Sequence, residues 1–190
     1  MSESLQICHL NGHLLSLTEA RIDPLDRGFL FGDALYEGIR VLGGTALFLE
    51  AHLDRLRAGL ERIEIPVPEG LQEACHQLVE ACELGTGFLY LQVTRGVAPR
   101  MHIPPLELAP TVLILASRPA FDPPAGRPQR LVTVPDWRWQ RNDLKTTSLM
   151  GTVLGKLEAR RTGADEVVFV SAAGELREGG STNLFVRVED

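Results

Sequence analysis

A proline-rich segment limits how this chain can fold more than any other feature of the sequence. Residues 117–130, SRPAFDPPAGRPQR, contain four prolines and one glycine between two apolar runs. Because proline lacks a backbone donor and fixes φ, no helix and no central strand can run through this segment. We therefore predict a linker here and two domains, residues 1–120 and residues 121–190. About 60 residues follow the linker, which is close to the lower limit for a free-standing domain, so we expect the second domain to be partial.

The first domain is predicted to be mixed α/β. Asn11-Gly12 lies between apolar runs, a pattern typical of a tight hairpin turn, so two strands should open the fold. Residues 26–42 are punctuated by glycines and become β-like at Ile39, which indicates a loop that leads into a strand. Apolar spacings of three and four then predict helices, and β-branched and aromatic runs predict strands. The expected helices are 53–63 and 71–82, and the expected strands are 87–95 and 111–116.

The second domain is predicted to alternate strands with one helix. Strands are expected near 131–134, at 166–171 and at 183–188. A helix is expected from about 148 to 162, capped by Thr147 or Ser148. The residues of this helix that we expect to face inward are Leu149, Val153, Leu154 and Leu157.

Charge and composition exclude several classes of function. The formal net charge of -6 is spread along the chain without a basic stripe, so a nucleic-acid partner is not expected. The N-terminus lacks a basic region followed by an apolar run, and no stretch reaches the about 18 apolar residues of a membrane span. We therefore expect a cytoplasmic protein with no membrane partner. The three cysteines, Cys8, Cys75 and Cys82, lack zinc-like spacing and are interpreted as core thiols, and no metal site is predicted.

Lysine is scarce in this sequence. Of 19 basic residues only Lys145 and Lys156 are lysines, which leaves 17 arginines. Because arginine stays protonated, a lysine in such a chain points to amine chemistry. Lys145, in RNDLKTTSLM, lies between a polar turn and the start of a predicted helix, where it could form a Schiff base with a carbonyl cofactor. The alternative for Lys145 is an exposed loop lysine.

A second motif, LREGGSTNLF, follows about 30 residues later. Glu178 precedes two glycines that allow close approach of a ligand, and Ser181, Thr182 and Asn183 then offer hydrogen-bond donors. Alone, this is a hairpin turn with a surface glutamate. Paired with a Schiff-base lysine, the glutamate supplies an acid that holds a pyridine nitrogen protonated, the arrangement used with pyridoxal 5′-phosphate (PLP).

Five motifs together resemble the class IV aminotransferases. They are DRGFLFGDALYEGIRV, HLDRL, LYLQVTRGVAPRMHIPP, RNDLKTTSLM and ELREGGSTNLF, and they occur in the order and spacing of that family. The resemblance covers the chain from about residue 8 to its end. It implies the fold type IV architecture of PLP enzymes, with a small α/β N-terminal domain and a pseudo-barrel second domain that is partial here.

The resemblance also implies roles for individual residues. Lys145 would carry PLP as a Schiff base and would move the proton between substrate and cofactor. Glu178 would hold the pyridine nitrogen, and Arg55, in HLDRL, would bind the phosphate. Ser181 and Thr182 would contact the cofactor. Without the resemblance, Arg55 is interpreted as an arginine on a helix surface.

The segment Ala98-Pro-Arg-Met-His102 resembles the D-amino-acid transaminase branch of the family. It implies that Tyr36, Arg100 and His102 bind the substrate carboxylate, the last two from the partner subunit of a homodimer. The expected reaction is transamination between a D-amino acid, such as D-alanine, and a 2-oxo acid.

Three alternatives stay open. An aminodeoxychorismate lyase or a branched-chain aminotransferase would keep Lys145 and Glu178 but would need another carboxylate site. A catalytically silent remnant would serve as a binding or dimerisation module. Members of the family extend beyond the point that corresponds to residue 190 and add a glycine-rich loop that binds the cofactor phosphate. We therefore expect the 190-residue chain alone to bind PLP poorly and to self-associate.

Overall fold

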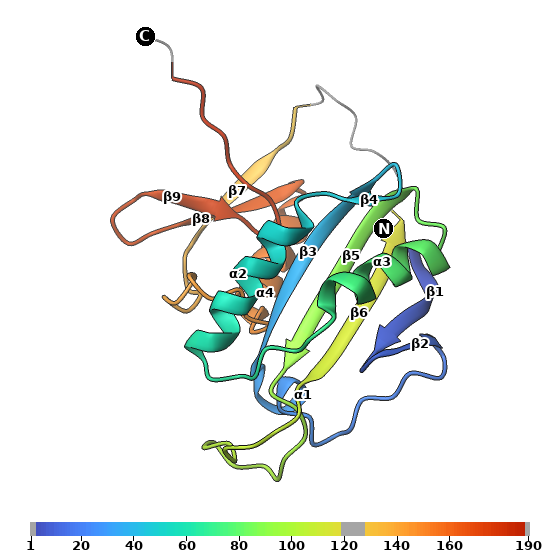
Figure 1. The fold of residues 1–190 in the computed structure, drawn as a ribbon. Coiled ribbons are helices and arrows are strands. Elements are labelled where there is room, and N and C mark those ends of the chain that lie inside the picture. The colour runs from blue at the N-terminus through green and yellow to red at the C-terminus, as the bar shows by residue number, and fades with distance from the viewer. Residues whose placement is uncertain (1–2, 119–127, 189–190) are drawn as a thin grey trace. The chain divides into compact units, whose positions relative to one another are not determined.

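The computed structural model describes residues 3–118 and 128–188 (Figure 1). The chain forms two compact units. The first is Met1–Asp122 with Asp143–Thr147, and the second is Pro123–Asn142 with Ser148–Asp190. Lys145 therefore belongs to the first unit although it follows the linker in the sequence. The predicted linker, residues 117–130, lies largely outside the described residues, and the predicted domain boundary between residues 120 and 121 stays a prediction.

The first unit is a six-stranded antiparallel sheet in the order β2-β1-β6-β5-β3-β4. Its two longer helices, α2 and α3, cover the same face of the sheet (Figure 1). The strands are β1 (Glu3–Leu10), β2 (His13–Ser16), β3 (Ala34–Leu42), β4 (Thr45–Ala46), β5 (Thr86–Thr94) and β6 (Thr111–Arg118), and the helices are α1 (Arg27–Phe31), α2 (Leu49–Arg62) and α3 (Leu71–Ala81).

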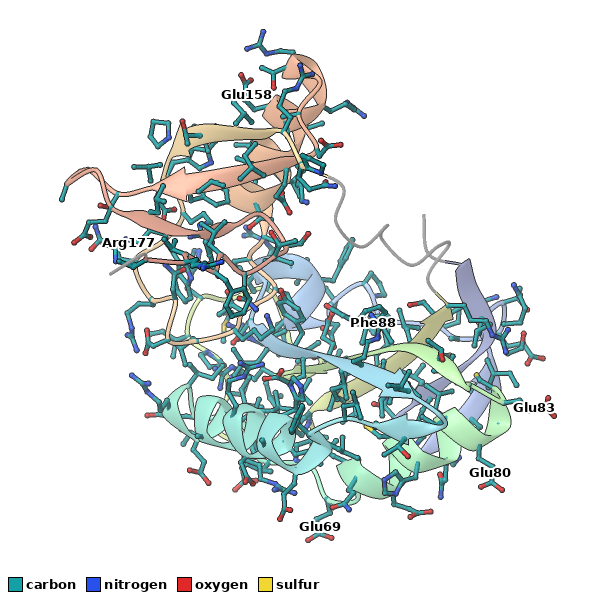
Figure 2. All side chains as sticks on the ribbon, turned by 90° about the horizontal axis from the view of Figure 1, so that it is seen from above. Glu69, Glu80, Glu83, Phe88, Glu158 and Arg177 are labelled. Atoms are coloured by element: carbon teal, nitrogen blue, oxygen red, sulfur yellow. The ribbon has the colours of Figure 1, made fainter. Side chains whose placement is uncertain are left out.

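The core of the first unit lies between the sheet and these two helices. Alternate side chains of the central strands point into it, among them Ile39, Leu89 and Ile114, which are fully buried. The apolar face of α2, with Leu53 and Leu60, covers them. The intervening side chains occupy the far face, the face of the sheet away from α2 and α3. Figure 2 shows Phe88 on this far face and Glu80 on the helix side.

Most elements predicted for the first unit are confirmed. The N-terminal hairpin turns at Asn11 and Gly12, both with positive φ, as a tight turn of this kind requires. The strand predicted within residues 26–42 begins at Ala34, earlier than Ile39, and a short helix precedes it. Asp26 caps that helix by accepting a hydrogen bond from the amide of Gly28 at 2.8 Å.

The second unit is a three-stranded sheet with one helix. β7 (Leu131–Pro135) and β8 (Glu166–Val170) pair in parallel, and α4 (Met150–Thr162) connects them in the sequence. β9 (Leu176–Gly179) is antiparallel to β8. The small core of this unit consists of Val134, Ala159, Val167 and Phe169, with Val132 and Ala164 packed against it.

Three predictions for the second unit are wrong. Residues 183–188 form no strand, since no neighbouring strand of the described chain pairs with them, and Phe185 is 93% exposed. The predicted inward residues of α4 are all more than a third exposed, because the helix packs through Gly155 and Ala159 instead. Gly155 allows the close approach, since a Cβ there would lie 2.8 Å from the ring of Phe169. The N-cap of α4 is Leu149, which makes no side-chain cap, and not Thr147 or Ser148.

The three cysteines lie in the first unit. Cys8 and Cys75 are fully buried, which confirms them as core thiols, whereas Cys82 is only partly buried against the core. Burial raises the pKa of Cys75 to about 12. Within residues 3–118 and 128–188, no helix is long and apolar enough to cross a membrane. The described residues also contain no group of three or more His, Cys, Asp or Glu side chains that could hold a metal ion.

Candidate functional site

Lys145 lies on a short segment that adds to the sheet of the first unit. The amide of Tyr36 donates to the carbonyl of Lys145 at 2.9 Å, and Leu35 and Thr146 form an antiparallel bridge next to it. Leu144, one residue earlier, is buried in the core. The backbone of Lys145 is therefore fixed on the edge of β3.

The side chain of Lys145 lies against an aromatic pair. Its Nζ is 4.4 Å from the ring centroid of Tyr36, which stacks on Tyr90 with 5.3 Å between ring centroids. The Tyr90 hydroxyl donates to the side-chain oxygen of Gln92 at 2.8 Å, and burial raises the pKa of Tyr90 to about 12. Among the described residues of the first unit, no carboxylate pairs with Lys145. The side chain of Lys145 is therefore half-buried against the phenol ring of Tyr36 and is not held in an ion pair by the first unit.

Glu37 follows Tyr36 on β3, so its side chain points to the other side of the strand. It is fully buried and accepts hydrogen bonds from Arg55 Nε at 2.7 Å, from Arg55 Nη2 at 2.5 Å, and from His52 Nδ1 at 2.8 Å. Because a carboxylate only accepts, His52 carries its proton on Nδ1. The hydrogen bonds to Glu37 raise the pKa of Arg55. Glu37 thus uses two of the five N–H donors of Arg55 and leaves the rest for a ligand.

Replacing Glu37 with glutamine is expected to lower the free energy of unfolding by about 1–3 kcal/mol. The substitution keeps the shape of the side chain but removes the carboxylate charge, to which both Arg55 and His52 are hydrogen-bonded. Urea unfolding of the two proteins measures the difference. Glu73→Gln, on the surface of α3, is the matched control and should leave stability unchanged. Equal stability of Glu37→Gln and wild type would contradict the structural role.

Arg100 and His102 lie on the loop between β5 and β6, and both contact Phe31 of α1. The Arg100 guanidinium is 5.4 Å from the ring centroid of Phe31, and the ring centroids of Phe31 and His102 are 5.7 Å apart. The two side chains that the sequence pattern predicts to bind a carboxylate therefore lie close together, because both contact the ring of Phe31. Both side chains remain exposed.

Asp33 lies between two arginines of the first unit. Burial acts to raise the pKa of Asp33, but hydrogen bonds from Arg95 and Arg27 outweigh it and hold the pKa below its usual value. Arg27 Nε is 2.8 Å and Arg95 Nε is 2.7 Å from Asp33 Oδ2. The ionised carboxylate is therefore stabilised in the folded state.

Because the pKa of Asp33 is lowered by folding, its contribution to stability is complete above the ordinary aspartate pKa of about 4 and is lost as the pH falls through the lowered value. Asp33→Asn is expected to be less stable than wild type by about 2 kcal/mol at neutral pH, with the difference shrinking below pH of about 4. Thermal unfolding across pH measures this difference. Asp54→Asn, at an exposed position of α2, is the control and should be close to wild type in stability at neutral pH. A stability gap that persists unchanged in acid would argue against this assignment.

In the second unit, Glu178 is paired with Arg138. One guanidinium nitrogen of Arg138 donates to Glu178 Oε1, and Arg138 also forms a fork with Asp136, with Nε 2.8 Å from Oδ1 and Nη2 2.9 Å from Oδ2. The guanidinium stacks 4.2 Å from the ring centroid of Phe169. Hydrogen bonds to Asp136 and Glu178 raise the pKa of Arg138. Glu178 therefore has one oxygen fixed by protein and Oε2 available to a ligand.

The segment after β9 turns tightly. A Cβ on Gly179 would lie 2.0 Å from the hydroxyl oxygen of Thr182, so only glycine fits there. The Thr182 hydroxyl donates to Glu166 Oε2 at 3.1 Å, and Lys156 Nζ is 2.7 Å from the same oxygen. Ser181 is exposed. Of the two lysines, Lys156 is thus used in a structural ion pair, unlike Lys145.

The structure brings some predicted site residues together and adds others. Tyr36 and Lys145 are in contact, and Arg100 and His102 share Phe31, whereas Glu178, Ser181 and Thr182 belong to the second unit. The residues that sequence reasoning missed are Glu37, His52, Tyr90 and Arg138. A glutamate at an inward position of an otherwise apolar strand was the available signal for Glu37, because a buried carboxylate needs a partner.

Taken one at a time, side chains of the two units have the chemistry that a phosphate-bearing pyridine aldehyde requires. Lys145 offers an amine without a competing carboxylate, Arg55 offers an oriented guanidinium with free donors, and Glu178 offers a carboxylate oxygen. An amine forms a Schiff base with an aldehyde, guanidinium N–H groups donate to a phosphate, and a carboxylate oxygen accepts from a protonated ring nitrogen.

Comparisons with known proteins give one family. Residues 34–190 match the sequence profile of the family described as Amino-transferase class IV. A D-alanine aminotransferase of Staphylococcus aureus (strain MSSA476) is 36% identical over 184 residues, which are 93% of this chain and 64% of that protein. The solved branched-chain amino acid aminotransferase of Escherichia coli has a TM-score of 0.80 at 20% identity, over 95% of this chain and 63% of that chain. The 4-amino-4-deoxychorismate lyase of Pseudomonas aeruginosa has a TM-score of 0.71 at 26% identity, over 92% of this chain and 64% of that chain. This chain spans less than two thirds of the length of each.

Proposed function

Because the chain belongs to the class IV aminotransferases, which are PLP-dependent enzymes, we propose that it transfers the amino group of a D-amino acid, such as D-alanine, to a 2-oxo acid. The observation that best supports this proposal is the surroundings of Lys145. Its backbone is fixed on β3, its Nζ lies beside Tyr36, and no carboxylate of the first unit pairs with it. A half-buried amine free of ion pairs suits Schiff-base chemistry.

Three residues would hold the cofactor. Arg55 would bind the phosphate with the donors that Glu37 leaves free, and Glu178 would hold a proton at the ring nitrogen through Oε2. PLP, when bound, supplies an electron sink that stabilises negative charge at the substrate Cα. Lys145 would bind the cofactor aldehyde and, once released by substrate, would move the proton between Cα and C4′. Ser181 is exposed and available to the cofactor, whereas Thr182 would have to share its hydroxyl with Glu166.

Reductive trapping tests the attachment site. The chain is incubated with PLP, reduced with borohydride to fix PLP to the amine that carries it, digested, and mapped by mass spectrometry. Label on the peptide that contains Lys145 is expected. Label on Lys156, or no label at all, would overturn the proposal and favour a silent binding module. Because borohydride reduction of the Schiff base is irreversible, labelled protein accumulates and PLP binding is detected even when its affinity is low.

The D-amino-acid preference rests on Tyr36, Arg100 and His102. A guanidinium, an imidazole and a phenol are suitable donors for an α-carboxylate. D-alanine aminotransferases at 36% identity support this choice, while the lyase at 26% identity is the observation that favours an aminodeoxychorismate lyase. Turnover of D-alanine, L-leucine and aminodeoxychorismate, compared on one preparation, separates the three functions. Preference for D-alanine is expected.

Arg100→Ala is expected to raise the KM for D-alanine about tenfold with a smaller change in kcat, since it removes one charged hydrogen-bond donor to the carboxylate. Steady-state kinetics measure both constants. Arg57→Ala, an exposed arginine paired with Asp54, is the matched control and should behave as wild type. An unchanged KM for Arg100→Ala would show that the carboxylate binds elsewhere.

We also propose a homodimer in which the loop between β5 and β6 of one subunit contributes Arg100 and His102 to the site of the other. Apolar side chains of this loop are highly exposed, Ile103 at 81% and Leu106 at 100%, which suits burial against a second copy. Mixing inactive Lys145→Ala subunits with high-KM Arg100→Ala subunits should then produce a low-KM component of about a quarter of wild-type activity, because half the dimers are mixed and each has one intact site. No recovery on mixing would exclude a shared site.

A further inference from the structure

One buried arginine of the first unit has no part in the proposed site. Arg27, the first residue of α1, is 3% exposed. Arginine is rarely buried unless its charge and its donors are all satisfied. The partners of its guanidinium therefore show what this residue is used for.

The guanidinium of Arg27 connects α1 to the loop between β5 and β6. Nε donates to Asp33 at 2.8 Å, which supplies the countercharge. Nη1 donates to the backbone carbonyl of Met101 at 2.6 Å, and Nη2 donates to the carbonyl of His102 at 3.1 Å. The flat face of the guanidinium lies 4.8 Å from the ring centroid of Phe31. Two of its three nitrogens thus bind consecutive carbonyls of one loop.

This loop has few other attachments near the same point. Residues 99–110 contain no helix or strand, and Met101 and Ile103 are 52% and 81% exposed. Arg100 directly precedes the two anchored carbonyls and His102 carries the second of them, and both side chains contact Phe31, the ring that Arg27 also covers. Arg27 therefore fixes the backbone at the place from which both side chains project.

We infer that Arg27 is a positioning residue for substrate recognition, which holds the Met101 and His102 carbonyls so that Arg100 and His102 present their side chains to the substrate carboxylate. This inference rests on the proposed function, because it assumes that these two side chains bind that carboxylate. Arg27 itself faces the loop backbone and Asp33, so it acts through the loop and not on the substrate.

The surroundings explain why a guanidinium occupies this position. The Asp33 carboxylate is shared with Arg95, whose Nη1 and Nη2 donate to the carbonyls of Glu64 and Ile63 at 2.8 and 2.7 Å. Two arginines around one aspartate thus hold two separate backbone segments. Lysine at position 27 could reach one carbonyl but could not bind two carbonyls and Asp33 in the same fixed plane. We therefore expect Arg27→Lys to retain only part of the anchoring of the loop between β5 and β6.

Limited proteolysis tests the anchoring on the full chain without cofactor or substrate. Trypsin can cleave after Arg100, and the cleavage rate reports how readily the loop leaves its anchored position. Arg27→Met removes the donors and keeps an apolar stem of similar length, and it is expected to be cut at Arg100 about tenfold faster than wild type. Arg57→Met is the control for loss of an exposed arginine. Cleavage at the wild-type rate in a folded Arg27→Met protein would overturn the inference.

Kinetics separate positioning from general stabilisation. For Arg27→Met the KM for D-alanine is expected to rise about ten- to hundredfold with kcat less affected, and Arg27→Lys should fall between it and wild type. The comparison substrate is D-alaninamide, which lacks the carboxylate and should be used equally well by wild type and both variants. An equal loss for D-alanine and D-alaninamide would mean that Arg27 only supports the fold, and this would overturn the inference.

The experiments distinguish failure of the proposed function from failure of the role inferred for Arg27. If the wild-type chain carries no PLP label on Lys145 and does not use D-alanine, the proposed function fails whatever Arg27 does. The proteolysis then decides the anchoring alone, and faster cleavage at Arg100 would support it. Melting temperatures of all variants accompany both tests. If Arg27→Met does not fold, Arg27→Lys is the variant that decides, and a wild-type cleavage rate in it would overturn the inference.

Discussion

Replacing Lys145 with alanine is expected to lower transamination at least about 1,000-fold and to abolish PLP labelling of the chain. The substitution removes the only group of the proposed site that can both bind an aldehyde and move a proton. The fold should be unaffected, because the hydrogen bond from the Tyr36 amide uses the backbone of Lys145 and the side chain is half-buried. Turnover of D-alanine, borohydride labelling and melting temperature measure the three effects.

Two further lysine variants make this test specific. Lys145→Arg keeps a positive charge beside Tyr36, but a guanidinium stays protonated, so it should be as inactive as the alanine variant. Lys156→Arg is the matched control, since arginine can keep the ion pair with Glu166. It should retain full activity and labelling. Turnover of Lys145→Ala within tenfold of wild type would refute the assignment of Lys145.

Local patterns in the sequence predicted most of the first unit. The Asn11-Gly12 turn and the apolar stripes of α2 and α3 depend on neighbouring residues, and the structure confirms all three. The fold class, fold type IV, came from motifs spread over the chain and is confirmed by the similar solved structures. Features that depend on short-range order or on a family pattern were therefore accessible from the sequence.

The second unit shows where local patterns fail. Residues 183–188 have β-forming composition, but a strand requires hydrogen bonds to a neighbour, and composition carries no information about that neighbour. On α4 the apolar side chains suggested the buried face, yet the smallest residues, Gly155 and Ala159, pack against the sheet. Close helix-to-sheet approach favours small residues there, which a count of apolar residues misses.

The site was predicted only in part for a related reason. Lys145, Arg55 and Glu178 were identified by rarity, motif and resemblance, and their roles stay predictions. The groups that orient them are far away in sequence: Glu37 is 18 residues before Arg55, and Arg138 is 40 residues before Glu178. Such pairings depend on strand register and on tertiary packing, so no local pattern reveals them.

Glu178→Gln is expected to reduce turnover about 100- to 1,000-fold while labelling of Lys145 persists. Glutamine is nearly isosteric, and its carbonyl oxygen can still accept the hydrogen bond from Arg138. The amide nitrogen that replaces Oε2 cannot accept, so the variant loses the ability to hold a proton at the ring nitrogen. Labelling depends on the amine of Lys145 and should survive, whereas turnover depends on the electron sink and should not.

The control for Glu178 lies three residues away on the same hairpin. Glu175 is exposed and pairs with Arg177 at 3.0 Å, so Glu175→Gln removes the same charge without touching the Arg138 network. It should turn over D-alanine at the wild-type rate. If the two glutamine variants lose activity equally, overall charge of the hairpin and not the carboxylate of Glu178 is what matters. If neither loses activity, the ring nitrogen is held by another residue and the role of Glu178 is only to pair with Arg138.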